Sequence, residues 1–122
     1  MPEIHTDTAC KGHLRSVQDT MELLSGKWKI YIISVLIFNE KQRFSELQRN
    51  LPGIGSKMLS KELQELELNQ LVKREVLLTK PITVEYSITD YGRTLGPIIG
   101  EIGKWGAAHR NKLFRKTEAA NS

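Results

Sequence analysis

Residues 44–90 constrain the fold of this chain more than any other segment does. Within residues 44–51, apolar side chains at positions 44, 47 and 51 share one face of a helix with 3.6 residues per turn. Pro52 and Gly53 follow directly and end that helix. A second helix is predicted over residues 57–66. Two short helices joined by a tight turn are therefore expected.

The second of these helices has an apolar side and a polar side. The apolar residues, which predict a buried side, are Met58, Leu59, Leu63 and Leu66. Ser56 is placed to cap the free N–H groups at the start of the helix. The polar residues that share the opposite side are Lys57, Ser60, Lys61 and Gln64. Each is of a type that hydrogen-bonds phosphate or a base edge, so this side is a candidate DNA-reading face.

A β-hairpin is predicted after the two helices. Residues 71–77 and 83–88 are rich in β-branched side chains, and residues 78–82 separate them. A helix-turn-helix followed by a basic hairpin is typical of a winged helix-turn-helix, whose second helix enters the major groove. A polar helix face alone is more often solvated surface, but this order of elements favours DNA binding.

Three further helices are expected around this unit. The first spans residues 14–24, with Val17, Met21 and Leu24 on one side, and a buried helix follows from Trp28 to Phe38. The last begins at the capping pair Thr89-Asp90. Its apolar stripe consists of Leu95, Ile98, Ile99, Ile102 and Trp105. The fold class expected is mainly α with a small β-hairpin (α+β).

The last helix contains an unusual number of glycines. They are Gly92, Gly96, Gly100, Gly103 and Gly106. Each costs about 1 kcal/mol relative to Ala inside a helix, so a compensating interaction is expected. The first three share one side and would let another helix approach closely. That helix could belong to a partner subunit or to the same chain.

Length and charge set outer limits on the function. With 122 residues the chain suits one domain over residues 14–114, between a flexible arm at 1–13 and a frayed tail at 115–122. Its net charge is +4, and residues 41–80 hold eight Lys or Arg against five Glu. The excess favours an anionic partner. The apolar run at 30–38 is too short for a membrane span, and no export signal is visible, so a cytoplasmic location is expected.

No catalytic or cofactor site is evident in the sequence. His5, Cys10 and His13 lack a reliable fourth metal ligand, and a Cys–His nucleophile would need an orienting group in a closed pocket. Phosphate-binding glycine loops, paired catalytic carboxylates and Ser-His-Asp patterns are not found. The chain is therefore expected to be neither an enzyme nor a metal or cofactor protein.

Five short segments, in order and spacing, carry a family resemblance. They are residues 26–29 (Gly-Lys-Trp-Lys), 43–47 (Arg-Phe-Ser-Glu-Leu), 51–54 (Leu-Pro-Gly-Ile), 57–59 (Lys-Met-Leu) and 84–89 (Val-Glu-Tyr-Ser-Ile-Thr). Over about residues 14–109 the chain resembles the HxlR-type bacterial transcriptional regulators, relatives of the MarR group. The resemblance implies a winged-helix homodimer whose recognition helices enter successive major grooves of a pseudo-palindromic operator. Repression is the commoner mode in that family.

The resemblance also assigns roles to individual positions. Arg43 matches a phosphate-contacting position, Lys80 lies at the wing tip, and Lys73 and Arg74 add backbone contacts. Taken with the polar helix face, the candidate DNA-binding residues are Arg43, Ser56, Lys57, Ser60, Lys61, Gln64, Lys73, Arg74 and Lys80. The first and last helices would form the dimer interface. Its candidate residues are Val17, Met21, Trp28, Leu95, Ile98, Ile99, Gly100, Ile102 and Trp105.

Several positions depart from the family pattern. Cys10, the candidate redox sensor, lies farther from Trp28 than the cysteine of redox-sensing relatives does, and a small molecule or an oxidant are both open as effectors. Thr83 stands where relatives often have Arg. Glu62 is expected to place a negative charge beside the reading face. Gln70 replaces a common glycine, so Asn69 is expected to take the left-handed conformation that ends the helix.

Two other functions remain open from the sequence. The same fold could bind an acidic protein surface, and such a module would show no affinity for duplex DNA. It could also bind DNA without regard to sequence, and then random DNA would compete fully. Steep salt dependence and a preference for one duplex would separate these alternatives from an operator-binding regulator.

Overall fold

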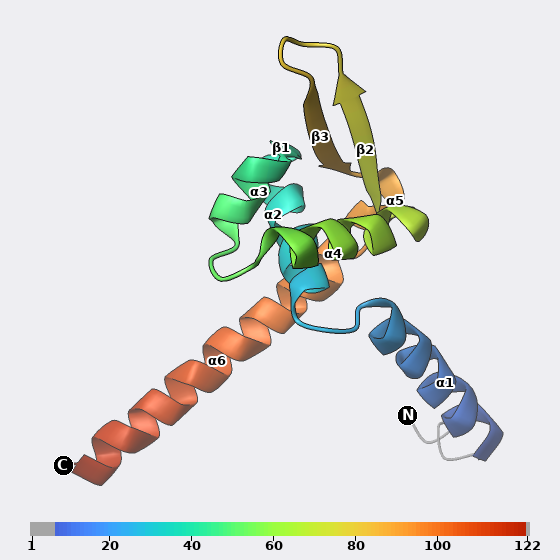
Figure 1. The fold of residues 1–122 in the computed structure, drawn as a ribbon. Coiled ribbons are helices and arrows are strands. Elements are labelled where there is room, and N and C mark those ends of the chain that lie inside the picture. Colours follow the sequence, from blue (N-terminus) through green and yellow to red (C-terminus); the bar gives the residue numbers. More distant parts are fainter. Residues whose placement is uncertain (1–6, 122) are drawn as a thin grey trace.

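The structure, a computed structural model, describes residues 7–121 and forms a winged body from which two helices extend (Figure 1). The helices are α1 (Asp7–Leu23), α2 (Trp28–Asn39), α3 (Phe44–Asn50), α4 (Ser56–Leu68), α5 (Asp90–Arg93) and α6 (Gly96–Asn121). The strands are β1 (Lys41–Arg43), β2 (Val72–Leu77) and β3 (Thr83–Ile88). A mainly helical fold with a small antiparallel sheet, as predicted, is confirmed.

Helix α2 forms the centre of the body. It contacts α3, α4 and α6 as well as β1 and β3. Ile32, Ile33 and Leu36 of α2 are completely buried. The core continues into the other elements through Leu47, Leu51, Ile54, Leu59, Leu63, Leu66, Leu71, Val72, Tyr86, Ile88 and Leu95. Burial of these side chains drives the two short helices and the sheet onto α2.

The sheet has three strands in the order β1-β3-β2, and both pairings are antiparallel. The hairpin of β2 and β3 was predicted, but β1 was not. Strand β1 has only three residues and no apolar pattern. Gln42 is buried in its middle, and the amide of Asn50 donates a hydrogen bond of 2.8 Å to the Gln42 Oε1. That contact ties the strand to α3.

Helix α4 ends at Leu68, and two residues later the backbone of Gln70 is left-handed with φ of 62°. The N–H of Leu71 donates to the Leu66 carbonyl, and the N–H of Gln70 donates to the Glu67 carbonyl. This is the Schellman pattern of helix termination. The prediction that Asn69 takes the left-handed conformation was wrong, because Asn69 instead donates its side-chain N–H to the Glu65 carbonyl at 3.0 Å.

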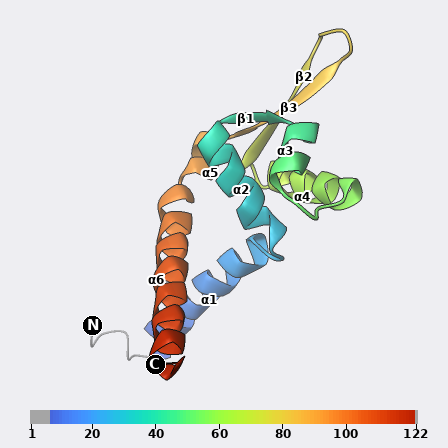
Figure 2. The same cartoon turned by 90° about the vertical axis from the view of Figure 1, so that its left-hand side faces the viewer.

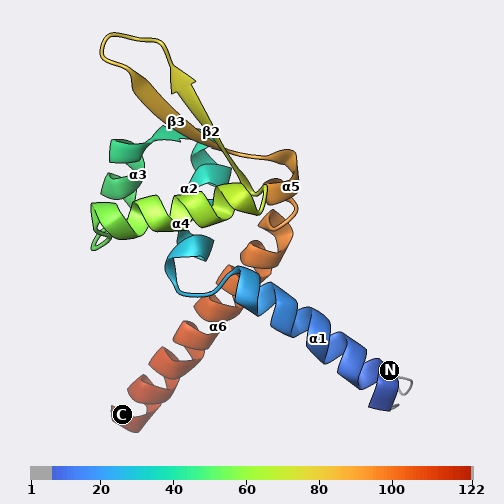
Figure 3. The same ribbon diagram turned by 45° about the vertical axis from the view of Figure 1, so that its right-hand side comes forward.

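Helices α1 and α6 leave the body on the side opposite the hairpin tip and diverge from each other (Figures 1 and 3). Figure 2 shows how far α6 extends from α2 and the sheet. Helix α1 starts at Asp7, so the expectation of an arm was wrong for residues 7–13, which have helical geometry without an apolar stripe. Helix α6 continues to Asn121, so its backbone is helical through most of the expected tail.

Gly92 is a close-contact position within the chain, not in a partner subunit. A Cβ added there would lie 2.7 Å from Ile88 Cδ1 and even closer to the Leu71 carbonyl oxygen. The Thr89 hydroxyl accepts the Gly92 N–H at 2.8 Å and caps a helix start, as predicted, but the helix it caps is the short α5, and the long helix begins separately at Gly96. By contrast, a Cβ on Gly100 would meet nothing within 4 Å among the described residues.

Replacing Gly92 with Ala should lower the free energy of unfolding by about 1–3 kcal/mol, because neither backbone nor core can yield to the added methyl group. Urea denaturation would measure the change. The matched control is Gly12→Ala, since an added Cβ at Gly12 has open space around it. Equal effects of the two substitutions would contradict the close packing at Gly92.

Candidate nucleic-acid interface

Helix α4 separates its apolar and polar residues between two sides. Leu59, Leu63 and Leu66 are at most 1% exposed and pack into the core. The polar residues predicted for the reading face are all exposed: Lys57, Ser60, Lys61 and Gln64. Met58, predicted to be buried, is 40% exposed, because it lies at the edge of the buried side. The helix thus presents a continuous polar face to solvent.

The start of α4 differs from the prediction. Gly55 occupies the N-cap position, and Ser56 is the first helical residue. The Ser56 hydroxyl accepts a hydrogen bond of 3.1 Å from the side-chain amide of Gln48, which lies on α3. Ser56 was therefore wrongly assigned as a cap. Instead, this contact joins the two helices of the helix-turn-helix, and Ser56 remains exposed beside Lys57.

Glu62 does not lie on the reading face. It is 6% exposed, and its carboxylate is 2.6 Å from the ammonium of Lys29 on α2. The prediction of a negative charge beside the reading face was therefore wrong. The same ammonium lies 2.5 Å from the Glu65 carboxylate. Lys29 is the one charged residue in the sequence of α2. Because a charge in a buried helix needs a partner of opposite charge, this lysine could have indicated a buried carboxylate on α4.

The Lys29 ammonium attracts both carboxylates of this cluster. Burial by itself lowers the pKa of Lys29, but hydrogen bonds to Glu62 and Glu65 and their negative charges outweigh it. The pKa of Lys29 is therefore raised above its ordinary 10.5. The hydrogen bond from Lys29 is the main reason that the pKa of Glu65 is lowered from its ordinary 4.5. Lys29 and Glu65 are accordingly both charged at neutral pH.

The two basic residues of β2 point to opposite faces of the hairpin, because side chains alternate along a strand. Arg74 pairs in register with Tyr86, and these two residues line a hollow with Ser60, Gln64 and Glu67 of α4. The hollow has a volume of about 340 Å³. Arg74 thus joins the polar face of α4 on one concave surface.

The other basic residue of β2 lies away from this hollow. Lys73 is on the opposite face of the hairpin, where its ammonium is 3.9 Å from the Glu75 carboxylate. Lys73 and Arg74 were predicted to act together, and the structure separates them.

The wing tip is exposed and partly apolar. Lys80 lies between Leu78 and Ile82, which are 91% and 66% exposed. The hydroxyls of Thr79 and Thr83 are 2.8 Å apart and close the base of the loop. The Thr83 hydroxyl therefore forms its hydrogen bond within the hairpin. The apolar residues beside Lys80 were not singled out from the sequence.

Arg43 lies at the junction of β1 and α3, apart from the polar face of α4. Its side chain is exposed, while its backbone N–H donates to the Glu46 carboxylate at 3.0 Å. In the sheet, Arg43 is paired with Glu85 of β3. The candidate DNA-binding residues therefore come from three places: the start of α3, the polar face of α4 and the wing.

Helices α1 and α6 carry the candidate interface residues. Val17 and Met21 of α1 and Ile98, Ile102 and Trp105 of α6 are all at least 42% exposed. Leu14 of α1 and Leu113 and Phe114 of α6 are also exposed. Large apolar side chains exposed along two helices favour a protein contact.

Other candidate interface residues have contacts within the chain. Leu95 is 8% exposed and belongs to the core of its own chain, so little of its side chain is available for a contact between subunits. Ile99 and Trp28 are partly buried and pack against that core. The Trp28 ring meets the Tyr31 ring edge-on at 5.8 Å, and the Lys27 ammonium lies 4.6 Å from its centre. Gly100 faces open space.

The remaining chemical groups of residues 7–121 form no cluster that binds a metal ion. Cys10 is a free thiol on the exposed part of α1. Within the described range, no three His, Cys, Asp or Glu side chains gather closely enough to hold a metal ion, and His5 lies outside that range. None of the described helices is both long and apolar enough to cross a membrane.

Comparison with known proteins identifies the relatives of this chain. The family model described as HxlR-like helix-turn-helix matches residues 23–114. The HTH-type transcriptional regulator YvaP of Bacillus subtilis (strain 168) is 44% identical over 88 residues, which cover 72% of this chain and 81% of YvaP.

Solved structures agree with this assignment. The redox regulator HypR in its reduced form is 41% identical, with a TM-score of 0.75 over 80% of this chain and 96% of HypR. The reduced form of the transcriptional regulator YodB from B. subtilis is 36% identical, with a TM-score of 0.66 over 74% and 87%. With its exposed helix α4 and its wing, this chain belongs to the HxlR-like helix-turn-helix family of transcriptional regulators.

Proposed function

We propose that this chain is a homodimeric repressor that binds a pseudo-palindromic operator through the α4 helices of its two subunits. The observation that carries the proposal is the concave surface on which Ser60 and Gln64 of α4 meet Arg74 of the wing. A helix with its apolar side buried and its polar side exposed can enter a major groove without losing its own packing. Lys57 and Lys61 add positive charge to the same face.

Different residues of this surface have different tasks. Lys61 and Gln64 lie one turn apart on the exposed side of α4, and side chains of these types can hydrogen-bond base edges. Arg43, Arg74 and Lys80 are exposed on other elements and are placed to neutralise phosphates. Lys73 faces away from the hollow beside α4 and is not expected to contribute strongly.

Dimerisation is supported by the exposure of α1 and α6. Helix α6 has 26 residues and is about 39 Å long, yet among its residues 96–115 the only partly buried ones lie in the first turn. Isolated helices are marginally stable in water, and these two also expose large apolar side chains. Association of two chains would cover these side chains. It would also hold two α4 helices at a fixed spacing, as a pseudo-palindromic operator requires.

Cys10 is the candidate effector site of this regulator. HypR is described as a redox regulator, and it shares the fold of this chain at 41% identity. Here Cys10 is exposed on α1, the helix expected at the dimer interface. Oxidation could link two α1 helices by a disulfide or attach a small thiol. Either product would restrain the helices that set the spacing of the α4 pair.

Lys61→Ala and Gln64→Ala should each reduce the preference for operator over random DNA by about 1–3 kcal/mol, because each removes a base contact. Lys80→Ala should weaken binding to both DNAs equally and lower the slope of log affinity against log salt by about one. Fluorescence anisotropy over a salt series would measure both quantities, with Lys73→Ala as the matched control. Wild-type discrimination in the Lys61 and Gln64 variants would show that α4 is not the reading helix.

The wild-type chain should sediment at twice its monomer mass of 13.9 kDa at micromolar concentration. Gly100→Leu should raise the monomer fraction, because a bulky side chain would enter a close helix contact between subunits. The comparison variant Gly100→Ala adds only a methyl group, which meets nothing within 4 Å among the described residues of its own chain, and it should raise the monomer fraction less than Gly100→Leu does. A monomeric wild type that does not dimerise on operator DNA would refute the dimer and the pseudo-palindrome together.

A mild oxidant such as diamide should change operator binding by the wild type and leave Cys10→Ser unaffected. The measurement is the same anisotropy assay before and after treatment, followed by reduction to test reversal. Identical responses of the two proteins would remove Cys10 as the sensor.

A further inference from the structure

We propose that Lys29 is a positioning residue for DNA reading: its ammonium clamps α4 to α2 and sets the direction in which α4 presents its polar face. The proposal rests on the proposed function, because it concerns how that function becomes specific. Its basis is the geometry of a buried cluster in which one cation of α2 meets two carboxylates of α4.

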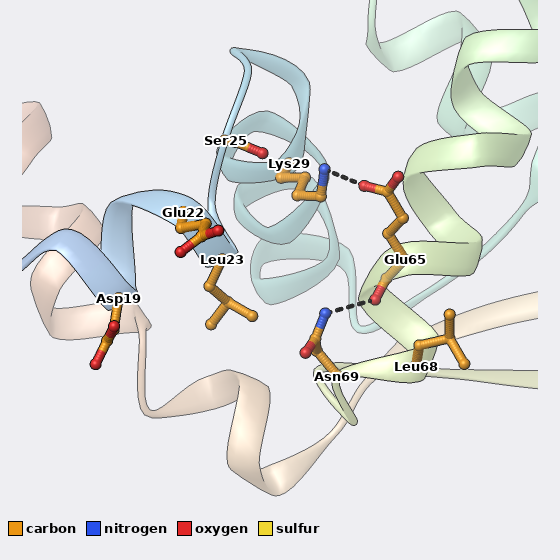
Figure 4. Close-up of a pocket in the computed structure, with 8 residues that line it drawn as sticks. All are labelled: Asp19, Glu22, Leu23, Ser25, Lys29, Glu65, Leu68 and Asn69. Atoms are coloured by element: carbon orange, nitrogen blue, oxygen red, sulfur yellow. Dashed lines mark hydrogen bonds and ion pairs between the residues drawn. The ribbon is translucent and has the colours of Figure 1, made fainter. Parts of the chain in front are cut away.

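The clamp has two anchors on successive turns of α4. The Lys29 ammonium is 2.6 Å from Glu62 and 2.5 Å from Glu65, and the Lys29 side chain is only 5% exposed. The Glu62 side chain is 8% exposed and that of Glu65 is 40% exposed. Figure 4 shows Lys29 reaching from α2 to Glu65, with Asn69 bound to the same turn of α4.

Stability alone does not account for this cluster. Burying charges costs solvation energy, and well-packed apolar residues in place of a buried ion pair are often as stable or more stable. Apolar packing has little directional preference, whereas an ammonium held between two carboxylates on successive turns favours one rotation of the helix that carries them. The leucines of α4 therefore hold the helix against α2, and Lys29 fixes its rotation.

The reading residues lie directly beside the two anchors. Lys61 precedes Glu62, and Gln64 precedes Glu65. Side-chain ends lie about 6 Å from a helix axis, so a rotation of about 20° displaces them by about 2 Å. Hydrogen bonds to base edges do not tolerate such a displacement. Phosphate attraction, which acts over a longer range, is much less affected.

Lys29 also lies where the dimerisation helix meets the reading unit. A hollow of about 380 Å³ beside it is lined by Asp19, Glu22 and Leu23 of α1 and by Glu65, Leu68 and Asn69 of α4 (Figure 4). In the described residues, none of the ion pairs involves Glu22. Glu22 therefore offers a control carboxylate in the same hollow that is not part of the clamp.

The test compares the wild type with the double variant Lys29→Met/Glu62→Leu, which keeps the net charge and replaces the buried pair by apolar side chains. Anisotropy would measure affinity for an operator duplex, identified by footprinting of the DNA beside the chain's own gene, and for random duplex. Thermal denaturation would verify folding. The expected result is a folded protein whose ratio of operator to random affinity falls at least tenfold, with random-DNA affinity and salt slope unchanged.

An unchanged ratio in the folded double variant would overturn the proposal. So would a parallel loss on both DNAs, which is the signature of general structural weakening. If the double variant does not fold, Glu65→Gln provides the test of the proposal, because it removes only the charge of the half-exposed Glu65 carboxylate. A ratio reduced threefold or more, against an unchanged ratio for Glu22→Gln, supports the clamp, and an unchanged ratio overturns it. Absence of any operator preference in the wild type would instead refute the proposed function.

Discussion

The packing of α4 on α2 is the interaction on which the rest of the structure depends. Leu59, Leu63 and Leu66 enter the same core as Ile32 and its neighbours on α2. Each fully buried side chain of this kind contributes about 1.5–3 kcal/mol. Because one side of α4 is buried in this way, its polar side must face outward. The Schellman turn at the end of α4 then leads directly into β2, which places Arg74 beside the polar face.

The winged body and the two long helices differ in how far their apolar residues are buried. The body is complete by itself, since its helices and sheet share one continuous core. Helices α1 and α6 are different, because their apolar residues remain on the surface and only the ends near α2 join the core. This difference supports the proposal that the body reads DNA and that the two long helices join the subunits. Lys29 lies where these two parts meet.

Periodic apolar patterns were sufficient to predict the two short helices and the polar face of α4, and enrichment in β-branched residues was sufficient to predict the hairpin. Features that depend on contacts between distant residues were not predictable in this way. Strand β1 forms only because β3 provides a partner, and Glu62 turns inward only because Lys29 of another helix meets it. Likewise, Gln70 takes the left-handed position because its backbone closes a turn that side-chain preferences do not reveal. The resemblance to the HxlR family was confirmed, whereas the DNA contacts of single residues stay predictions.

The most direct measurement of DNA reading by α4 is a guanine N7 methylation-protection experiment on the DNA that flanks this protein's own gene. N7 lies in the major groove, so protection there reports entry of the recognition helices. Two protected blocks are expected on one face of the duplex, with centres about 10 base pairs or a multiple of that apart. Protection that is absent, or spread evenly along the DNA without paired blocks, would contradict sequence reading by a pair of α4 helices.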